Sequence, residues 1–364
     1  MHLEAFELHQ PTTLDEALQV AASHPGDCDY LAGGTDLLPN YKMRLNPRGH
    51  VIALGKIPEL HVFAPEEGTL GSLVTLRQME REEAIARDYP GLSEAARQVA
   101  TPLVRASGSL GGNLLVETRC FFFNQSASWR EALGYCLKAE GDRCHVVPQK
   151  ERCYATFSGD LVPSLLVLGA EVDLVSLQGP RTLALDELYD PRGDGIRRTR
   201  LLPGELVVRI RIPPGGRKSR STYRKLRVRP AFDFPELGVA ALLSLEGQRV
   251  RSLRLAVGGL ETYPRSFPTL TDPLEGTTLT DESIAELARR VQGMVRPVHN
   301  TFLAPDYRKR MTEVFVRRAL TDLREASCPP GPGPPGSPPA PPAPQSSDTG
   351  SNWSPWPPSA PMKR

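Results

Sequence analysis

The chain has 364 residues, of which 40% are hydrophobic and 24% are charged, and its formal net charge is +2. This length and composition allow two or three domains with ordinary apolar cores. A charge so close to neutral, without a basic block, speaks against a nucleic-acid-binding protein. The N-terminal residues lack the apolar segment of a signal peptide, and the longest apolar run, Leu161–Ala170, is too short to span a membrane. We therefore expect a cytoplasmic protein without membrane contact.

Helix and strand patterns alternate through the first part of the chain. Leu14, Ala17, Leu18 and Ala21 fall on one face of a helix that follows the cap candidates Thr12 and Thr13. The further elements that we expect are strands at Cys28–Ala32, Val51–Leu54, Leu70–Leu76 and Glu171–Val175, and helices at Met79–Arg87, at Leu92–Val99 and in a segment that ends at Leu165–Gly169. Interleaved elements of this kind predict an α+β fold with mixed strands.

From Leu206 onward the pattern changes to strands followed by helices. Strands are predicted at Leu206–Ile212, Leu237–Leu245 and Val250–Val257, and helices at Asp281–Met294 and Asp306–Leu323. On the last helix, arginines such as Arg308 are expected on a basic face that is either solvated or docks a subunit. Proline makes up 14 of the 36 residues from Pro329 to Arg364, so this segment, with Trp353 and Trp356, is predicted to be a disordered tail.

Two glycine loops are candidate ligand sites, one in Leu31–Leu38 and one in Ser107–Asn113. Paired glycines let the backbone adopt positive φ and approach a ligand closely, and successive N–H groups in such turns can hold a phosphate. Neither loop matches a Walker A motif or the GxGxxG fingerprint, and most Gly-Gly pairs are simple turns. Asp36 counts against a phosphate, unless its side chain turns away and caps a helix.

Four of the six cysteines lie together in a segment that has little other apolar material. Cys120, Cys136, Cys144 and Cys153 have the spacing C-x15-C-x7-C-x8-C. Four thiolates suit a [4Fe–4S] cluster or a tetrahedral zinc ion, although neither the ferredoxin run nor paired C-x2-C motifs are present. Unrelated buried thiols and disulfides are the competing interpretations, and a cytoplasmic setting disfavours disulfides.

Three motifs in order resemble the FAD-binding subunit of the xanthine dehydrogenase (molybdenum hydroxylase) superfamily. They are Ala-Gly-Gly-Thr-Asp-Leu at 32–37, Ser-Leu-Gly-Gly-Asn at 109–113 and Gly-Asp-Leu-Val-Pro at 159–163, and the likeness covers about residues 1–322. The resemblance implies an α+β, two-lobed FAD-binding domain of the molybdopterin dehydrogenase (PCMH) type and a smaller α/β C-terminal domain. The expected bounds are 1–56 for the first lobe, 57–214 for the second, 114–158 for an inserted iron–sulfur loop, 215–325 for the C-terminal domain and 326–364 for the tail.

The same resemblance implies which residues bind the cofactor. In that family both glycine loops wrap the FAD pyrophosphate, and the residues matching Asp160 and Lys225 lie near the cofactor. Asp160 also suits a helix N-cap, and Lys225 also suits a surface position on a strand. The implied FAD-binding residues are Leu31, Ala32, Gly33, Gly34, Thr35, Asp36, Leu37, Leu38, Thr101, Ser109, Leu110, Gly111, Gly112, Asn113, Asp160 and Lys225.

The cysteine segment looks like the corresponding part of the 4-hydroxybenzoyl-CoA reductase β subunit. Both have Thr-Arg-Cys followed by aromatic residues, then Trp-Arg, Cys-x7-Cys and Cys-x8-Cys. This likeness implies that Cys120, Cys136, Cys144 and Cys153 bind a [4Fe–4S] cluster, with His145 a neighbour rather than a ligand. It also implies a large molybdenum-cofactor subunit and a small [2Fe–2S] subunit in a dimer of heterotrimers, with reduced ferredoxin as electron donor.

Three hypotheses on function follow from these patterns. The first is an oxidoreductase subunit of the 4-hydroxybenzoyl-CoA reductase type, which carries FAD and [4Fe–4S] and serves the reductive removal of a phenolic hydroxyl. The second is the FAD subunit of an oxidising enzyme of the xanthine, aldehyde or CO dehydrogenase type, whose cysteine segment is vestigial or binds zinc. The third is a non-catalytic nucleotide-binding or assembly protein on the same fold. No side chain of this chain is expected to be catalytic, because the cofactor carries the chemistry.

Overall fold

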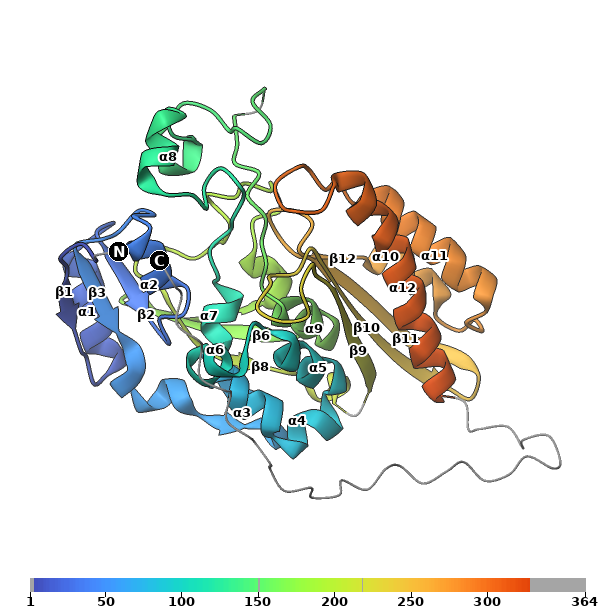
Figure 1. The fold of residues 1–364 in the computed structure, drawn as a ribbon. Helices are drawn as coiled ribbons and strands as arrows, with labels where there is room; N and C mark the ends of the chain where they lie inside the picture. Colours follow the sequence, from blue (N-terminus) through green and yellow to red (C-terminus); the bar gives the residue numbers. More distant parts are fainter. Residues whose placement is uncertain (1–2, 150, 218, 328–364) are drawn as a thin grey trace, which may run out of the picture. The chain divides into compact units, whose positions relative to one another are not determined.

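The computed structural model describes residues 3–149, 151–217 and 219–327. Residues 326 and 327 of the predicted tail end the last described helix, and the rest of the tail, with Trp353 and Trp356, lies outside the described residues. Within the described part, three β-sheets follow one another along the chain (Figure 1). None of the described helices is both long enough and apolar enough to cross a membrane.

The first sheet has three parallel strands in the order β1-β3-β2. The strands are β1 (Glu7–His9), β2 (Cys28–Leu31) and β3 (His50–Ala53), and helix α1 (Leu14–Ser23) covers one face. The Thr13 side chain caps α1 by accepting a hydrogen bond from the Glu16 amide, as the sequence predicted. Helix α2 (Leu37–Lys42) follows the first glycine loop directly.

The second sheet has five antiparallel strands in the order β4-β5-β8-β6-β7. Its strands are β4 (Phe63–Ala64), β5 (Thr69–Gly71), β6 (Glu171–Ser176), β7 (Gly179–Ala184) and β8 (Leu206–Arg211). The helices that accompany it are α3 (Leu76–Arg81), α4 (Glu83–Asp88), α5 (Pro90–Gln98), α6 (Pro102–Ser107), α7 (Leu110–Leu114) and α9 (Leu161–Leu168). The apolar sides of these helices and of the sheet form the largest core cluster of the described residues.

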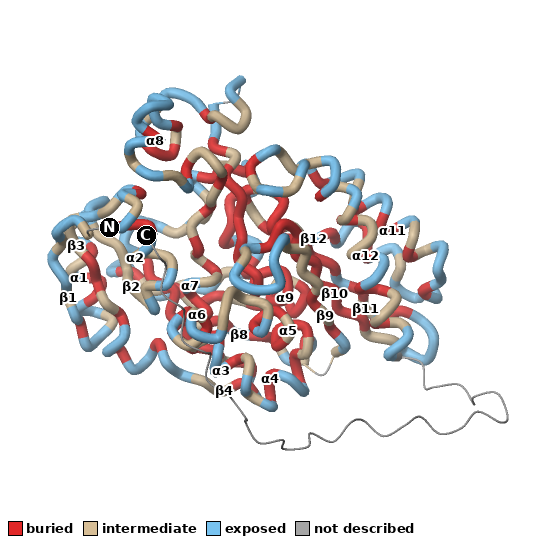
Figure 2. The backbone as a smooth tube through the Cα atoms, in the orientation of Figure 1, coloured by how far each residue is buried: buried red, intermediate tan, exposed pale blue. Residues whose placement is uncertain are grey.

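The third sheet is antiparallel, with the order β12-β11-β10-β9. Its strands are β9 (Arg220–Leu226), β10 (Leu237–Glu246), β11 (Arg249–Gly258) and β12 (Arg265–Ser266), and the helices after it are α10 (Pro268–Thr271), α11 (Asp281–Met294) and α12 (Pro305–Ser327). Alternate residues of β10 serve two cores, because Val239 packs toward α11 and α12 while Ala240 packs toward α5 and α9. Figure 2 shows this strand buried along most of its length.

The cysteine segment stands apart from the three sheets. Its α-helix is α8 (Ala127–Ala132), drawn at the top of Figure 1, and one short 3-10 turn, η4 (Leu137–Ala139), follows. The other short 3-10 turns are η1 (Leu54–Lys56), η2 (Pro58–His61), η3 (Pro65–Glu67), η5 (Leu185–Leu188), η6 (Pro214–Gly216) and η7 (Asp272–Leu274). The segment is closed at its base by an antiparallel bridge between Arg119 and Thr156.

Two predicted elements and the predicted position of Arg308 differ from the structure. The predicted strand Leu70–Leu76 ends at Gly71, because the chain turns there to hydrogen-bond the second glycine loop. The predicted helix Met79–Arg87 is two helices, since Glu82 is extended and its side chain caps α4. Arg308 is fully buried rather than on a basic face, and it donates to backbone carbonyls of Glu236 and Gly259.

Candidate functional site

A cavity of about 460 Å³ opens between the two glycine loops. The first loop enters it from the end of β2, and the second enters it from the start of α7. Ten of the sixteen predicted FAD-binding residues line the cavity: Ala32, Gly33, Gly34, Thr35, Asp36, Leu37, Ser109, Gly112, Asn113 and Asp160. Segments far apart in the sequence are thus brought together around one space.

The two glycine loops pack directly on each other. A Cβ atom on Gly33 would lie 1.7 Å from the Ser107 carbonyl oxygen, so only glycine allows this contact. Gly34 has a φ of +71°, and the side chains of Leu31 and Leu38 pack beneath it. In the described part of the chain, the amides of Gly33, Gly34 and Thr35 donate to no protein acceptor. These free donors at a glycine turn suit an anionic group such as a pyrophosphate.

Asp36 turns away from those amides, but it is not the helix cap that the sequence suggested. Its side chain makes no cap hydrogen bond to α2. Instead it is ion-paired with Arg119, whose guanidinium also donates to the Asn40 amide oxygen at 2.6 Å. Asp36 therefore holds Arg119 in the cavity wall, and the positive charge of Arg119 neutralises the negative charge of Asp36.

Asp160 and Lys225 form a buried ion pair beneath the cavity. Their side chains are 3.0 Å apart, and the Tyr223 hydroxyl donates to Asp160 at 2.7 Å. Burial raises the pKa of the Asp160 carboxyl and lowers the pKa of the Lys225 ammonium, while the pair itself opposes both shifts. The surface position considered for Lys225 is wrong, since its side chain is fully buried.

The helix cap expected of Asp160 is supplied by another residue. Asp160 makes no cap hydrogen bond, and the Asn113 side chain accepts from the Leu161 amide at 3.0 Å. Asn113 thereby fixes the second glycine loop to the start of α9 across the whole cysteine segment.

The remaining predicted residues surround the cavity without lining it. Thr101 caps α6 by accepting from the Val104 amide. Leu110 lies in the core, and Gly111 packs on the Ser72 backbone. These residues, together with Leu31, Leu38 and Lys225, lie behind the residues that line the cavity.

Several cavity residues were not predicted from the sequence. Arg119 and Arg198 line the cavity, and the buried Nε atom of each has no hydrogen-bond partner within the described chain. Ala100 and Phe232 have φ values of +39° and +74°, and the Phe232 amide donates to the Ala100 carbonyl. Positive φ is costly for such residues and gathers at functional sites, but alanine and phenylalanine give no sequence signal for it.

The four cysteines of the inserted segment line one small cavity. Cys120, Cys136, Cys144 and Cys153 are each at most 8% exposed, and all four are free thiols. The disulfide alternative is therefore wrong for these described cysteines. His145 also borders the cavity, but its Nε2 is hydrogen-bonded to the Tyr135 carbonyl.

The four cysteine sulfurs do not have the spacing of an assembled tetrahedral zinc site. A tetrahedral zinc ion with Zn–S bonds of about 2.3 Å holds its sulfur ligands about 3.8 Å apart. Among the described residues, no three of the cysteine sulfurs lie within 4.8 Å of one another. Four buried cysteine sulfurs around one cavity are suitable ligands for either a zinc ion or a [4Fe–4S] cluster.

Two cysteine sulfurs accept backbone hydrogen bonds. The Phe123 amide donates to Cys120, and the Ala155 amide donates to Cys153, both at 3.4 Å. Burial raises the pKa of the Cys120 thiol to about 11 and that of Cys153 to about 12. These thiols are protonated near neutral pH, so a metal must displace their protons on binding.

A buried polar network and one aromatic side chain connect the two cavities. Lys138 borders the cysteine cavity and donates to Glu117 at 2.5 Å, and Arg198 donates to the same carboxylate at 3.1 Å from the wall of the larger cavity. Phe123 lines both cavities, with the Lys138 ammonium 5.1 Å from its ring centre. The two sites are therefore neighbours.

Comparison with known proteins identifies the fold. The family model described as "FAD binding domain in molybdopterin dehydrogenase" matches residues 4–215, and the model described as "CO dehydrogenase flavoprotein C-terminal domain" matches residues 221–323. The chain therefore belongs to the FAD-binding subunits of the molybdenum hydroxylase family, and the predicted fold class is confirmed.

Relatives of this family are similar along most of the chain. The aldehyde oxidoreductase FAD-binding subunit PaoB of Escherichia coli (strain K12) is 33% identical over 72% of this chain and 83% of its own length. The carbon monoxide dehydrogenase medium chain of Afipia carboxidovorans is 25% identical over 87% of this chain and 96% of its own. The carbon monoxide dehydrogenase structure from Hydrogenophaga pseudoflava superimposes with a TM-score of 0.73, at 24% identity, over 90% of this chain and 100% of that chain.

These comparisons favour the oxidising hypothesis over the reductive one. The relatives are named as aldehyde oxidoreductase and carbon monoxide dehydrogenase subunits, and others as nicotine 6-hydroxylase and caffeine dehydrogenase subunits. A special closeness to 4-hydroxybenzoyl-CoA reductase has its support only in the cysteine pattern.

Proposed function

We propose that this chain is the FAD and [4Fe–4S] subunit of an oxidising molybdenum hydroxylase. The observation that carries the proposal is the juxtaposition of two cavities inside a flavoprotein fold, one lined by glycine loops and one lined by four buried cysteines. FAD supplies two-electron and one-electron redox chemistry, and the cluster supplies one-electron transfer.

In this proposal the chain's own residues bind and shield the two cofactors. The amides of Gly33, Gly34 and Thr35, with the guanidinium of Arg119, hold the FAD pyrophosphate. The Asp160–Lys225 pair fixes the floor of that cavity. Cys120, Cys136, Cys144 and Cys153 are the cluster ligands, and burial keeps water from the cluster.

The proposed partners follow from the same family. Relatives are named medium chains and medium subunits, which supports assembly with a large molybdenum-cofactor subunit and a small [2Fe–2S] subunit. A dimer of such heterotrimers, and ferredoxin as a redox partner at the cysteine cavity, remain predictions. The reductive alternative, removal of a phenolic hydroxyl from an aryl-CoA, reverses the direction of electron flow.

Anaerobic purification of the full chain tests the cofactor content. We expect one FAD and about four iron atoms per chain, with absorbance of both flavin and cluster. Yellow protein that takes up no iron even after reconstitution would contradict the cluster, and colourless protein would contradict the flavin site as well. Cys28→Ser is the matched control for cysteine variants, because Cys28 lies on β2 outside the cavity.

The assembled complex tests the direction of electron flow. Because one relative is an aldehyde oxidoreductase subunit, we expect an aldehyde to reduce the bound flavin through the partner subunits. Flavin that stays oxidised with aldehydes and related substrates, in a complex that uses reduced ferredoxin to dehydroxylate an aryl-CoA, would instead establish the reductive alternative.

A further inference from the structure

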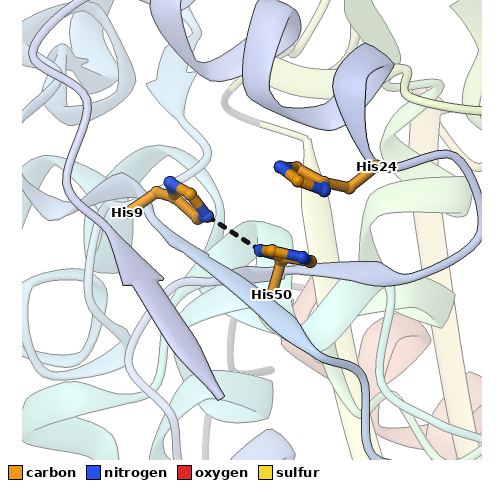
Figure 3. A group of neighbouring side chains, drawn as sticks. All are labelled: His9, His24 and His50. Atoms are coloured by element: carbon orange, nitrogen blue, oxygen red, sulfur yellow. Dashed lines mark hydrogen bonds between the residues drawn. The ribbon is translucent and has the colours of Figure 1, made fainter.

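Three histidines from separate segments meet at the end of the first sheet, away from both cavities. His9 is the last residue of β1, His50 is the first residue of β3, and His24 is the C-cap residue of α1 (Figure 3). One ring nitrogen of each histidine lies within 4.8 Å of a ring nitrogen of the other two. In the described part of the chain, no other three histidine, cysteine or acidic side chains form such a group. The proposed flavin and cluster sites do not use them.

The strand register explains why these side chains share one face. Glu7 and His9 are two residues apart on β1 and so point to the same side of the sheet, and Glu7 is the register partner of His50. His24 reaches the same place from the end of α1, the helix that covers this face. The convergence is thus built by the parallel β1–β3 pair and its covering helix.

The nitrogen spacing of His9 and His50 suits a shared metal ion, whereas the stacked His24 ring must turn about its side-chain bonds to point its lone pair at the same ion. His9 Nε2 and His50 Nδ1 are 3.1 Å apart, and the His24 ring stacks on His50 with 3.5 Å between ring centres. A tetrahedral ion with metal–nitrogen bonds of about 2.0–2.1 Å places its ligand nitrogens about 3.4 Å apart. The spacing of His9 and His50 is close to this value, so an ion can replace the proton that the two rings share.

A carboxylate beside the histidines completes the set. One Glu7 oxygen lies 3.7 Å from His9 Nε2, and the other lies 3.7 Å from His50 Nδ1. The Glu7 side chain is 66% exposed and is free to rotate toward an ion. Three imidazoles and a carboxylate match the ligand preference of zinc and of similar divalent transition metals.

We propose that His9, His24 and His50, with Glu7 beside them, bind one divalent transition-metal ion of the zinc class. The ion ties the edge strand β1 to β3 and to the end of α1. This site is independent of the proposed function, because its ligands lie outside the glycine loops and outside the segment that carries Cys120, Cys136, Cys144 and Cys153.

The test is zinc binding by the full chain carrying its FAD and iron. Zinc is added to chelator-washed protein, unbound metal is removed, and zinc and iron are counted together. Losing a residue that only hydrogen-bonds to a metal ligand lowers metal affinity by about 10–100-fold. Because His24 is proposed as a direct ligand, His24→Ala should weaken zinc binding by at least about 100-fold. His61→Ala is the matched control, because His61 is an exposed histidine outside the group whose ring contacts the Gly55 carbonyl.

X-ray absorption at the zinc edge separates this site from the cysteine cavity. We expect only nitrogen and oxygen neighbours at about 2.0–2.1 Å, whereas zinc in the cysteine cavity would show sulfur at about 2.3 Å. Zinc should also raise the Tm of the wild type and leave that of His24→Ala unchanged. Wild-type protein that binds no zinc, binds it only through sulfur, or loses none of it in His24→Ala would overturn the proposal, and iron and flavin contents check that each variant is folded.

Discussion

The cavity between the two glycine loops, named here the flavin cavity, and the cavity lined by the four cysteines, named the cysteine cavity, both contain the side chain of Phe123. The two cavities are otherwise built from different parts of the chain. The flavin cavity is formed largely by backbone at the ends of β2, α6 and α7, which sheet and helix hydrogen bonds hold in place. The cysteine cavity is lined by the four cysteines and six other residues of one segment, whose regular structure is one short helix and one 3-10 turn. The fold itself therefore encodes the flavin site, whereas the cysteine site depends on what its side chains bind.

The largest expected effect comes from removing one cluster ligand. Cys120→Ser should abolish the cluster, with iron falling from about four atoms per chain to none, while FAD is retained. Without its metal the segment around α8 loses the bonds that order it, so it should become sensitive to protease. Iron analysis, flavin absorbance and limited proteolysis measure this, and loss of flavin together with iron would break the distinction between the two cavities.

Removing the buried cation beneath the flavin cavity should destabilise the fold itself. Lys225→Met leaves the Asp160 carboxyl buried without its partner, which costs about 3–5 kcal/mol in free energy of unfolding. Lys56→Met, at an exposed lysine, should change stability by less than about 0.5 kcal/mol. Denaturant unfolding of flavin-free protein measures both, and equal midpoints for the two variants would show that the pair does not support the cavity floor.

Crowding the contact between the two glycine loops should weaken flavin binding without touching the cluster. In Gly33→Ala the new methyl group collides with the Ser107 carbonyl, and such overpacking costs about 1–3 kcal/mol, or about tenfold or more in FAD affinity. Gly55→Ala is the control, because open space surrounds that position. Flavin titration and iron analysis of the two variants measure this effect. If both variants bind FAD as tightly as the wild type, the prediction is wrong.

The smallest expected effect lies in the network that joins the two cavities. Burial acts to raise the pKa of Glu117, but Lys138 and Arg198 outweigh burial and hold that pKa at about 2. The Glu117 carboxylate therefore contributes its stability in full above about pH 4.5 and loses it as the pH falls toward about 2. Between about pH 2 and pH 4.5, the slope of the unfolding free energy against pH should be smaller in Glu117→Gln than in the wild type, by up to about 1.4 kcal/mol per pH unit. An unchanged slope would show that this carboxylate is not held ionised.

The sequence predicted the structure best at residue types that have few possible structural roles. The glycine loops were located correctly as neighbours of one cavity, because paired glycines mark close approach of the backbone, as at Gly33 and Gly111, although among the glycines of the two loops only Gly34 has a positive φ. The four cysteines were grouped correctly, because a long segment with little apolar material needs another source of order. The helices α1 and α11 were predicted within a residue or two, since their caps and apolar spacing agree.

The failures share a different cause, because they depend on contacts between distant segments. Arg308 looks like any surface arginine in a basic helix, and only the carbonyl oxygens of Glu236 and Gly259 explain its burial. The pairing of Asp36 with Arg119 joins positions separated by 83 residues. His9, His24 and His50 have no motif spacing, and only the register of β1 and β3 brings two of them together. The roles assigned to the flavin and cluster residues remain predictions for the variants above.

The bridge between Arg119 and Thr156 has a consequence for how such a segment can change. Two backbone hydrogen bonds, of 3.0 and 2.7 Å, join the chain where it leaves the second glycine loop and where it returns to α9. The segment between these residues therefore starts and ends at the same place, although it also contacts the flavin cavity through Phe123 and the carbonyls of Met43 and Arg44 through Arg130. The length and content of this segment can therefore change at one point of the chain while its paired ends stay in place.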